Sequence, residues 1–292
     1  MMRTTLAIAL LWTALPLAAG ADQFRDSVRV EPGGTLTIDL DRGSVDVETN
    51  GEDEVRVEAS ASGLGAGSVD FELMSDGRDA RFIARSGGWS MGLFGGLRIR
   101  VVARVPERYS IKVDTGGGRI EIEEIDGQVE AKTSGGRITL DGATGDVTLR
   151  TSGGRISAEN ILGDLLVRTS GGPIRVSEVR GSVEVRTSGG RIVIDEVVGP
   201  VIARTSGGSI TVRFDGDPEG VLETSGGSID VEIPEGAGVD LDARTSGGRV
   251  VVQPEITISG AFRSNQMEGS INGGGPKLRL RTSGGNISVE ER

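Results

Sequence analysis

The hydrophobic and polar residues of this chain alternate in a pattern that repeats about every 18 residues. Within one unit, counted from a Thr as position 1, apolar side chains occupy positions 6, 8, 11, 15 and 17, as in Thr151–Arg168. Alternation with period 2 is typical of half-buried strands, so each unit is predicted to contain two main strands. The repeats are marked by Thr-Ser-Gly-Gly, which begins at Thr133, Thr151, Thr169, Thr187, Thr205, Thr224, Thr245 and Thr282, and by a variant at Thr115.

A unit this short cannot bury its own apolar face, but stacked copies can. The sequence therefore predicts an all-β, parallel β-solenoid, with Thr pointing inward or lying at the edge of the wall. Gly at positions 3, 4 and 13 is expected to mark two corners that need positive φ, with room for a short third strand at the second corner. The spacing of the marker loosens after Thr205 to 19, 21 and 37 residues, and a degenerate turn is expected around 267–271.

The region before the repeats, residues 22–109, is β-like but irregular, and we predict that it caps the solenoid. Residues 43–47 with 55–57 resemble a worn copy of the repeat, and 69–73 with 81–84 a hairpin. A cap is expected because the first rung of a solenoid leaves open sheet edges. The predicted domains are a signal peptide (1–21), an irregular β cap (22–109) and a TSGG-repeat solenoid (110–292).

The first 21 residues have the features of a secretory signal. Arg3 precedes an apolar stretch at 6–17, and Ala19-Gly20-Ala21 provides a cleavage site. An uncleaved membrane anchor is the alternative, although the stretch is shorter than the roughly 20 residues that span a bilayer. We therefore predict an exported protein, in the periplasm, at the cell envelope or outside the cell, with no transmembrane segment after cleavage.

Regular T-x-G-G-x-[IV] units after a signal peptide and an irregular β segment resemble a bacterial family of β-strand-repeat proteins, DUF4097. The resemblance covers roughly residues 36–289. It implies a secreted or envelope-associated, adhesin-like β-solenoid, and it supplies no catalytic residues.

Composition narrows the chemistry further. The chain has no Cys and no His, which excludes thiol and imidazole nucleophiles, disulfides and thiolate metal sites. A net charge of −11 argues against a nucleic-acid partner. We predict no cofactor and no metal site.

Basic residues recur on both sides of the TSGG corner, at positions 5 and 18, where strand alternation points them outward. Stacked Arg side chains suit repeating anionic groups, such as those of a polysaccharide or another envelope component. The alternative is a solvated face whose charges stack only because the repeat was copied. The predicted ridge consists of Arg119, Arg137, Arg150, Arg155, Arg168, Arg186, Arg191 and Arg204.

A Gly-rich segment at 86–96 interrupts the pattern with three large apolar residues: Trp89, Met91 and Phe94. Exposed apolar loops often contact a partner or a membrane. The alternative is that Trp89 and Phe94 fold over the open end of the solenoid as a plug.

Catalysis is not expected, because the TSGG serines have no evident activating base and the acidic residues at positions 9 and 10 are spread along the stack. The predicted function is a non-catalytic, adhesin-like binding or structural solenoid. A periplasmic scaffold without a specific ligand and, further behind, a polysaccharide-acting enzyme are the alternatives.

Overall fold

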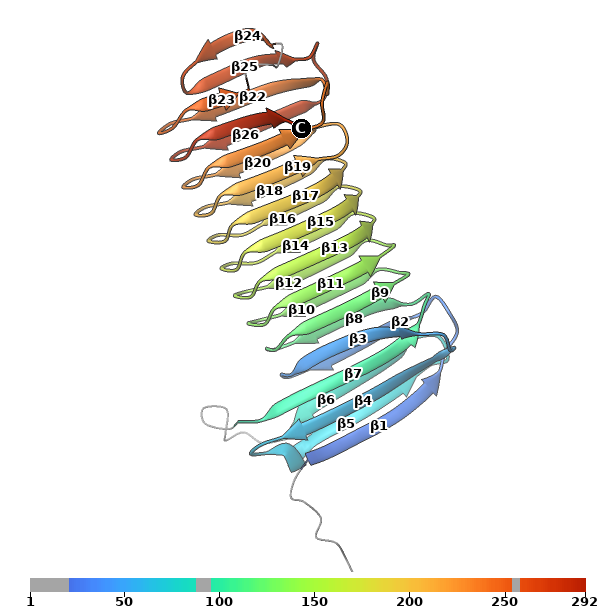
Figure 1. Cartoon of the computed structure of the whole chain (residues 1–292). Coiled ribbons are helices and arrows are strands. Elements are labelled where there is room, and N and C mark those ends of the chain that lie inside the picture. The colour runs from blue at the N-terminus through green and yellow to red at the C-terminus, as the bar shows by residue number, and fades with distance from the viewer. Residues whose placement is uncertain (1–20, 88–95, 254–257) are drawn as a thin grey trace, which may run out of the picture.

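The computed structural model describes residues 21–87, 96–253 and 258–292, and it confirms the predicted parallel β-solenoid. Two long sheets face each other in an elongated stack (Figure 1), with a short 3-10 helix, η1 (Ala66–Ser68), near one end. In spatial order, the 13-stranded sheet A contains β1 (Ala21–Arg29), β4 (Glu54–Ser62), β7 (Arg98–Pro106), β3 (Ser44–Asn50), β9 (Ile120–Ile125), β11 (Ile138–Ala143), β13 (Ile156–Leu162), β15 (Ile174–Arg180), β17 (Ile192–Val198), β19 (Ile210–Phe214), β21 (Ile229–Ile233), β27 (Ile287–Glu291) and β23 (Val250–Val252).

Sheet B has 14 strands and lies opposite. In the same direction along the stack it contains β5 (Val69–Ser75), β6 (Ala80–Ser86), β2 (Thr35–Leu40), β8 (Ser110–Thr115), β10 (Val129–Thr133), β12 (Val147–Thr151), β14 (Leu165–Arg168), β16 (Val183–Arg186), β18 (Val201–Thr205), β20 (Gly220–Thr224), β26 (Lys277–Thr282), β22 (Val239–Thr245), β25 (Gln266–Ile271) and β24 (Ile258–Arg263).

Each rung of the repeat supplies one strand to each sheet. The rung that begins at Thr151 places β13 in sheet A and β14 in sheet B, and each pairs in parallel with the equivalent strands one rung before and after. Equivalent residues lie in register, so each position of the repeat forms a column in which successive residues are about 4.8 Å apart. Inward positions 6, 8, 11, 15 and 17 of this rung are all buried: Ile156, Ala158, Ile161, Leu165 and Val167.

The marker Thr points inward, as predicted, and it ties neighbouring rungs together. Thr151 is only 7% exposed; its Oγ1 donates to the carbonyl of Gly136 at 3.0 Å and accepts from the N–H of Gly154 at 3.3 Å. The same pair of bonds recurs at Thr169 and Thr187. A hydroxyl at this position therefore satisfies two backbone groups at a buried corner.

The second glycine of the marker is needed for a reason other than the predicted one. Gly153 and Gly154 do not adopt φ in the left-handed region. A Cβ on Gly154 would instead lie 1.8 Å from the carbonyl oxygen of Gly136 in the preceding rung, whereas a Cβ on Gly153 would meet nothing within 4 Å. The requirement at position 4 is thus close approach between turns, and the expectation of positive φ at positions 3 and 4 was wrong for these turns.

At the opposite corner, positive φ is found at two positions. Gly163, at position 13, has φ of 156°, and Gly181 has 151°. Position 10 lies within the sheet A strand and is also left-handed, with φ of 54° at Glu178 and 58° at Asn160. This kink lets position 11 point inward again, so in the regular rungs a single bent strand replaces the third strand for which the sequence left room.

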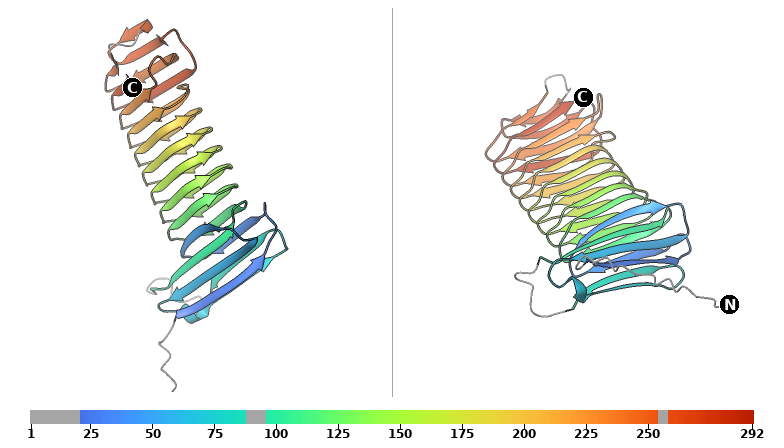
Figure 2. Two further views of the ribbon diagram at one scale, coloured as in Figure 1. Left: turned by 45° about the vertical axis from the view of Figure 1, so that its right-hand side comes forward. Right: turned by 60° about the horizontal axis from the view of Figure 1, so that its bottom comes forward.

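The predicted cap region forms the first strands of both sheets (Figure 2). The pair β2 and β3 is a true rung, because both strands run parallel to β8 and β9. The predicted hairpin is confirmed as β5 and β6, whereas residues 55–57 lie in β4, which pairs antiparallel with β1 and β7. Three aromatic rings, of Phe24, Phe71 and Phe82, pack together between the sheets with centroids 5.6–6.2 Å apart. Whether this region is a separate domain from the repeats stays a prediction.

The other end of the stack departs from chain order. The last rung, β26 with β27, inserts between the rung of β20 and β21 and the rung of β22 and β23, so the C-terminus lies inside the stack (Figure 1). The expected degenerate turn at 267–271 was wrong: these residues belong to β25, which pairs antiparallel with β22 and β24. An antiparallel hairpin covers the edge of sheet B, where a further parallel rung would leave it open.

Candidate ligand-binding edge

The Thr-Ser-Gly-Gly turns form one long edge of the molecule, here called the TSGG edge, and the basic residues flank it on both sheets. On sheet B, position 18 is the last residue before each Thr, and its members pair in register from strand to strand. On sheet A, position 5 immediately precedes each strand. The side chains are exposed or half-buried, on the outer side of both sheets. Position 18 contains Lys132, Arg150, Arg168, Arg186 and Arg204, and position 5 contains Arg119, Arg137, Arg155 and Arg191.

Carboxylates neutralise half of the predicted ridge. Arg168 and Arg186 share Glu184 at 3.0 and 2.9 Å, and Arg204 lies 2.7 Å from Glu223. The hydrogen bond from Arg168 holds the pKa of Glu184 below its ordinary value. Arg119, on the other face, contacts Asp46 and Glu121 at 3.0 and 3.1 Å, and the hydrogen bond to Asp46 raises its pKa.

The other half of the ridge has no such partner. Within the described residues, no carboxylate lies within 4.0 Å of the guanidinium of Arg137, Arg150, Arg155 or Arg191. All four side chains are exposed. Four uncompensated cations thus lie along one edge of a protein whose net charge is −11.

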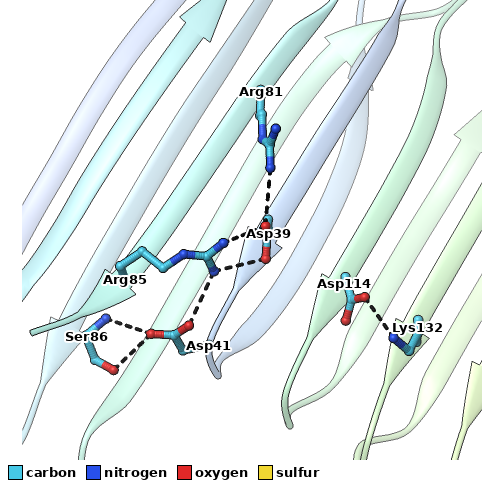
Figure 3. Close-up of polar contacts among 7 residues, drawn as sticks. All are labelled: Asp39, Asp41, Arg81, Arg85, Ser86, Asp114 and Lys132. Atoms are coloured by element: carbon cyan, nitrogen blue, oxygen red, sulfur yellow. Dashed lines mark hydrogen bonds and ion pairs between the residues drawn. The ribbon is translucent and has the colours of Figure 1, made fainter. Parts of the chain in front are cut away.

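The basic column on sheet B ends at its N-terminal side, where acidic residues take the equivalent positions (Figure 3). Lys132 binds Asp114 at 3.0 Å, and the next rung places Asp39 at the equivalent position. Asp39 is held by Arg85 at 2.6 Å and by Arg81 at 3.4 Å, and the hydrogen bond from Arg85 lowers its pKa. In the sheet B column, the basic residues that lack a carboxylate partner among the described residues therefore begin at Arg150.

Arg85 extends this network to a second carboxylate. It lies 3.3 Å from Asp41, whose other oxygen accepts from the N–H and the hydroxyl of Ser86 at 2.9 and 3.1 Å (Figure 3). With every one of these charges partnered, the cluster offers no free group to a ligand and acts as a tie between β2 and β6.

One basic residue near the TSGG edge was not predicted from the sequence. Arg175 occupies position 7, two residues after Pro173, where the two neighbouring rungs have Ser157 and Val193. It is exposed and lines a shallow hollow together with Arg155 and Arg191. Strand alternation would have placed it outward on sheet A, but no column of like residues drew attention to it.

The other predicted features offer less. Trp89, Met91 and Phe94 lie outside the described residues, as does the predicted signal peptide up to Gly20. The described parts of the chain contain no cluster of three or more residues suited to a metal ion, and no helix there is long and apolar enough to cross a membrane.

The profile of the family described as Toastrack DUF4097 matches residues 34–290. The chain belongs to this family. This match confirms the resemblance to the family that the repeat suggested.

Solved structures with a similar arrangement are distant in sequence. A "putative cell adhesion protein" from Clostridium sporogenes is 14% identical, with 93% of this chain and 100% of that chain covered and a TM-score of 0.24. A "putative adhesin" from Parabacteroides distasonis is 12% identical, with coverages of 93% and 97% and a TM-score of 0.36. One from Bacteroides fragilis is 10% identical, with coverages of 93% and 97% and a TM-score of 0.31. Comparison with curated proteins gives no match.

Proposed function

We propose that this protein is an exported, non-catalytic, adhesin-like solenoid that binds anionic polysaccharide along its TSGG edge. The observation that carries the proposal is the set of four exposed guanidinium groups without a carboxylate partner among the described residues: Arg137, Arg150, Arg155 and Arg191.

The chemistry of these groups suits sulfate and carboxylate. A guanidinium donates two parallel hydrogen bonds to such an oxyanion, and it loses less hydration than an ammonium when it does so. Because equivalent residues recur at about 4.8 Å per rung, a polymer with repeating anions can engage several rungs at once. The overall negative charge of the protein opposes this at long range, so binding depends on the local edge and on salt.

Catalysis is not part of the proposal. The chain contains no His or Cys to activate a TSGG serine, and its acidic residues at positions 9 and 10 are spread along the stack. Export follows from the predicted signal peptide, and fractionation of the native cells tests it: the protein should be found in the periplasm, the envelope or the medium. A cytosolic location would contradict this part of the proposal.

Retention on immobilised dextran sulfate, compared with neutral dextran, tests the binding. The variant Arg137→Ser/Arg150→Ser removes two free cations from the TSGG edge. The control Arg108→Ser/Arg180→Ser removes two exposed cations from the opposite edge, where neither has an ion pair within the described residues. Both variants therefore have the same net charge.

An exposed ion pair contributes about 0.2–1 kcal/mol, so the loss of two should weaken binding roughly 2- to 30-fold, with the control unchanged. Retention should also fall steeply as salt rises above about 0.15 M. If wild type does not bind dextran sulfate, or if both variants weaken binding equally, the TSGG edge is not a binding surface. A periplasmic scaffold without a specific ligand is then the better explanation.

A further inference from the structure

Between Arg119 and Arg191, the Arg column of sheet A is interrupted once. Pro173 occupies position 5 between Arg155 and Arg191. This alignment follows from the strands after these residues, which pair in register at Ile156, Ile174 and Ile192. Pro is tolerated here because the residue lies just before β15 and donates no ladder hydrogen bond. Its carbonyl still accepts from Ile156 N–H at 3.2 Å. The interruption therefore changes the surface and leaves the rung intact.

The missing side chain leaves a hollow of about 370 Å³ on the outer face of sheet A. Three guanidinium-bearing residues surround it: Arg155 and Arg191 from the rungs on either side, and Arg175 from the rung of Pro173 itself. Arg155 and Arg191 are two rungs apart, roughly 9–10 Å along the stack. Pro173 and Val193 give the hollow an apolar part, and Ser157 contributes a hydroxyl. The volume is within the range of small-ligand sites.

In the part of the chain that the structure describes, no carboxylate forms an ion pair with the arginines of this hollow. Position 9, the next outward position on sheet A, is Glu159 and Asp195 in the neighbouring rungs but Ser177 in the rung of Arg175. Asp195 is engaged by Arg213 at 2.8 Å. Within the described residues, none of the three arginines has a carboxylate within 4.0 Å. Three like charges that converge on one hollow without a counter-charge repel one another, and a bound anion would relieve this repulsion.

We propose that the hollow at Pro173 binds one anionic sugar unit of the polymer. Its sulfate or carboxylate group lies among Arg155, Arg175 and Arg191, and its ring lies over Pro173 and Val193. The inference rests on the proposed function, and it adds a defined subsite to an otherwise repetitive edge. Binding at the hollow needs shape as well as charge, whereas binding elsewhere along the edge needs charge alone.

The decisive variant is Pro173→Arg, which restores the column. The backbone accepts Arg at the equivalent position in both neighbouring rungs, so the variant should fold, and it adds positive charge while it fills the hollow. A second variant, Arg175→Ser, removes one cation from the hollow. Its matched control is Arg180→Ser, at the other end of the same strand, β15, with the same change of charge.

Calorimetric titrations with glucosamine 6-sulfate, glucuronate, inorganic sulfate and glucose measure the subsite, and retention on dextran sulfate measures the edge. Wild type should bind the sulfated sugar or glucuronate saturably at one site, and more tightly than inorganic sulfate or glucose. Pro173→Arg and Arg175→Ser should each weaken this binding roughly 10-fold or more, because each loses charge-assisted contacts or the space for them. Arg180→Ser should bind as wild type does, and Pro173→Arg should keep or increase its retention on dextran sulfate.

The subsite is refuted if wild type shows no saturable binding of either sugar, if inorganic sulfate binds as tightly as the sugars, or if Pro173→Arg leaves binding intact. Retention on dextran sulfate that persists in those cases leaves the proposed function standing. Loss of retention by wild type on the polymer removes both proposals together.

Discussion

The close approach of successive turns predicts opposite effects for two adjacent glycines. In Gly154→Ala, the new Cβ would lie 1.8 Å from the carbonyl oxygen of Gly136 and 2.4 Å from its carbon. Both contacts are with backbone, so no side chain can rotate away, and the turn must separate from the preceding rung. In Gly153→Ala, the Cβ meets nothing within 4 Å and the backbone is not left-handed.

The size of the effect follows from what the separation breaks. Moving the turn of Gly154 strains its hydrogen bonds with Thr151 and Thr169, at 3.3 Å each. Two hydrogen bonds at about 0.5–1.5 kcal/mol each, with about 1–3 kcal/mol for overpacking, predict a loss of about 2–6 kcal/mol. Gly153→Ala should change stability by less than about 1 kcal/mol, and in the stabilising direction, because Ala restricts the unfolded chain.

Equilibrium unfolding in urea, followed by far-UV circular dichroism, measures both variants against wild type. A long repeat stack can unfold in parts, so the slope with urea must be compared as well as the midpoint. Close approach between turns is refuted as the requirement for Gly154 if Gly153→Ala is as destabilising as Gly154→Ala, or if Gly154→Ala leaves the unfolding midpoint unchanged.

Three further predictions concern the buried Thr, a Glu with a left-handed backbone conformation and a carboxyl group with a raised pKa. Thr187→Val should lose about 1–3 kcal/mol of unfolding free energy in urea, because its hydroxyl satisfies two backbone groups, whereas Thr187→Ser should lose less. Glu178→Gly should raise the unfolding free energy by about 1 kcal/mol, since φ of 54° costs a non-Gly residue; an unchanged midpoint would contradict this. Partial desolvation of the carboxyl group and the nearby Glu290 raise the pKa of Asp230, so the folded state binds this proton more tightly than the unfolded chain. Asp230→Asn should therefore be more stable than wild type at pH 7, and thermal melts should show the difference vanish below the ordinary pKa of 3.8.

The regular rungs were predictable because their period links each apolar residue to a neighbour of the same kind. Ile156, Ile174 and Ile192 can only form a column if successive strands are parallel and in register. The order of the rungs near the C-terminus was not predictable in this way. A copy of the repeat pairs equally well with any other copy, so Ile287 finds Ile229 on one side and Val250 on the other. Local sequence specifies the rung, whereas its place in the stack depends on which strand edges are free: the hairpin pairs with one edge of β22, and the last rung pairs with the other.

The reason for each Gly was also hidden from the sequence. A requirement for close approach, as at Gly154, depends on which carbonyl lies opposite, and only the stacked structure supplies that carbonyl. The left-handed position 10 left a weak signal, since the chain places Gly142 and Asn160 there, the two residue types that tolerate this conformation best. Glu178 and Glu196 at the same position concealed it.

The basic edge is separable from the fold. Position 5 accepts Pro173 and Ser209 in place of Arg, and position 18 of sheet B accepts Glu223, and the strand residues beside them still pair in register. The TSGG rungs share the buried Thr and the second Gly at this corner. The fold does not require the arginines. Those that pair with a carboxylate can be explained by the ion pairs they form, whereas those without a carboxylate partner in the described part of the chain have no such explanation. The uncompensated charge around Pro173 therefore has no structural role in the described contacts, and this is why the edge, rather than the core or the far corner, is where binding should be sought.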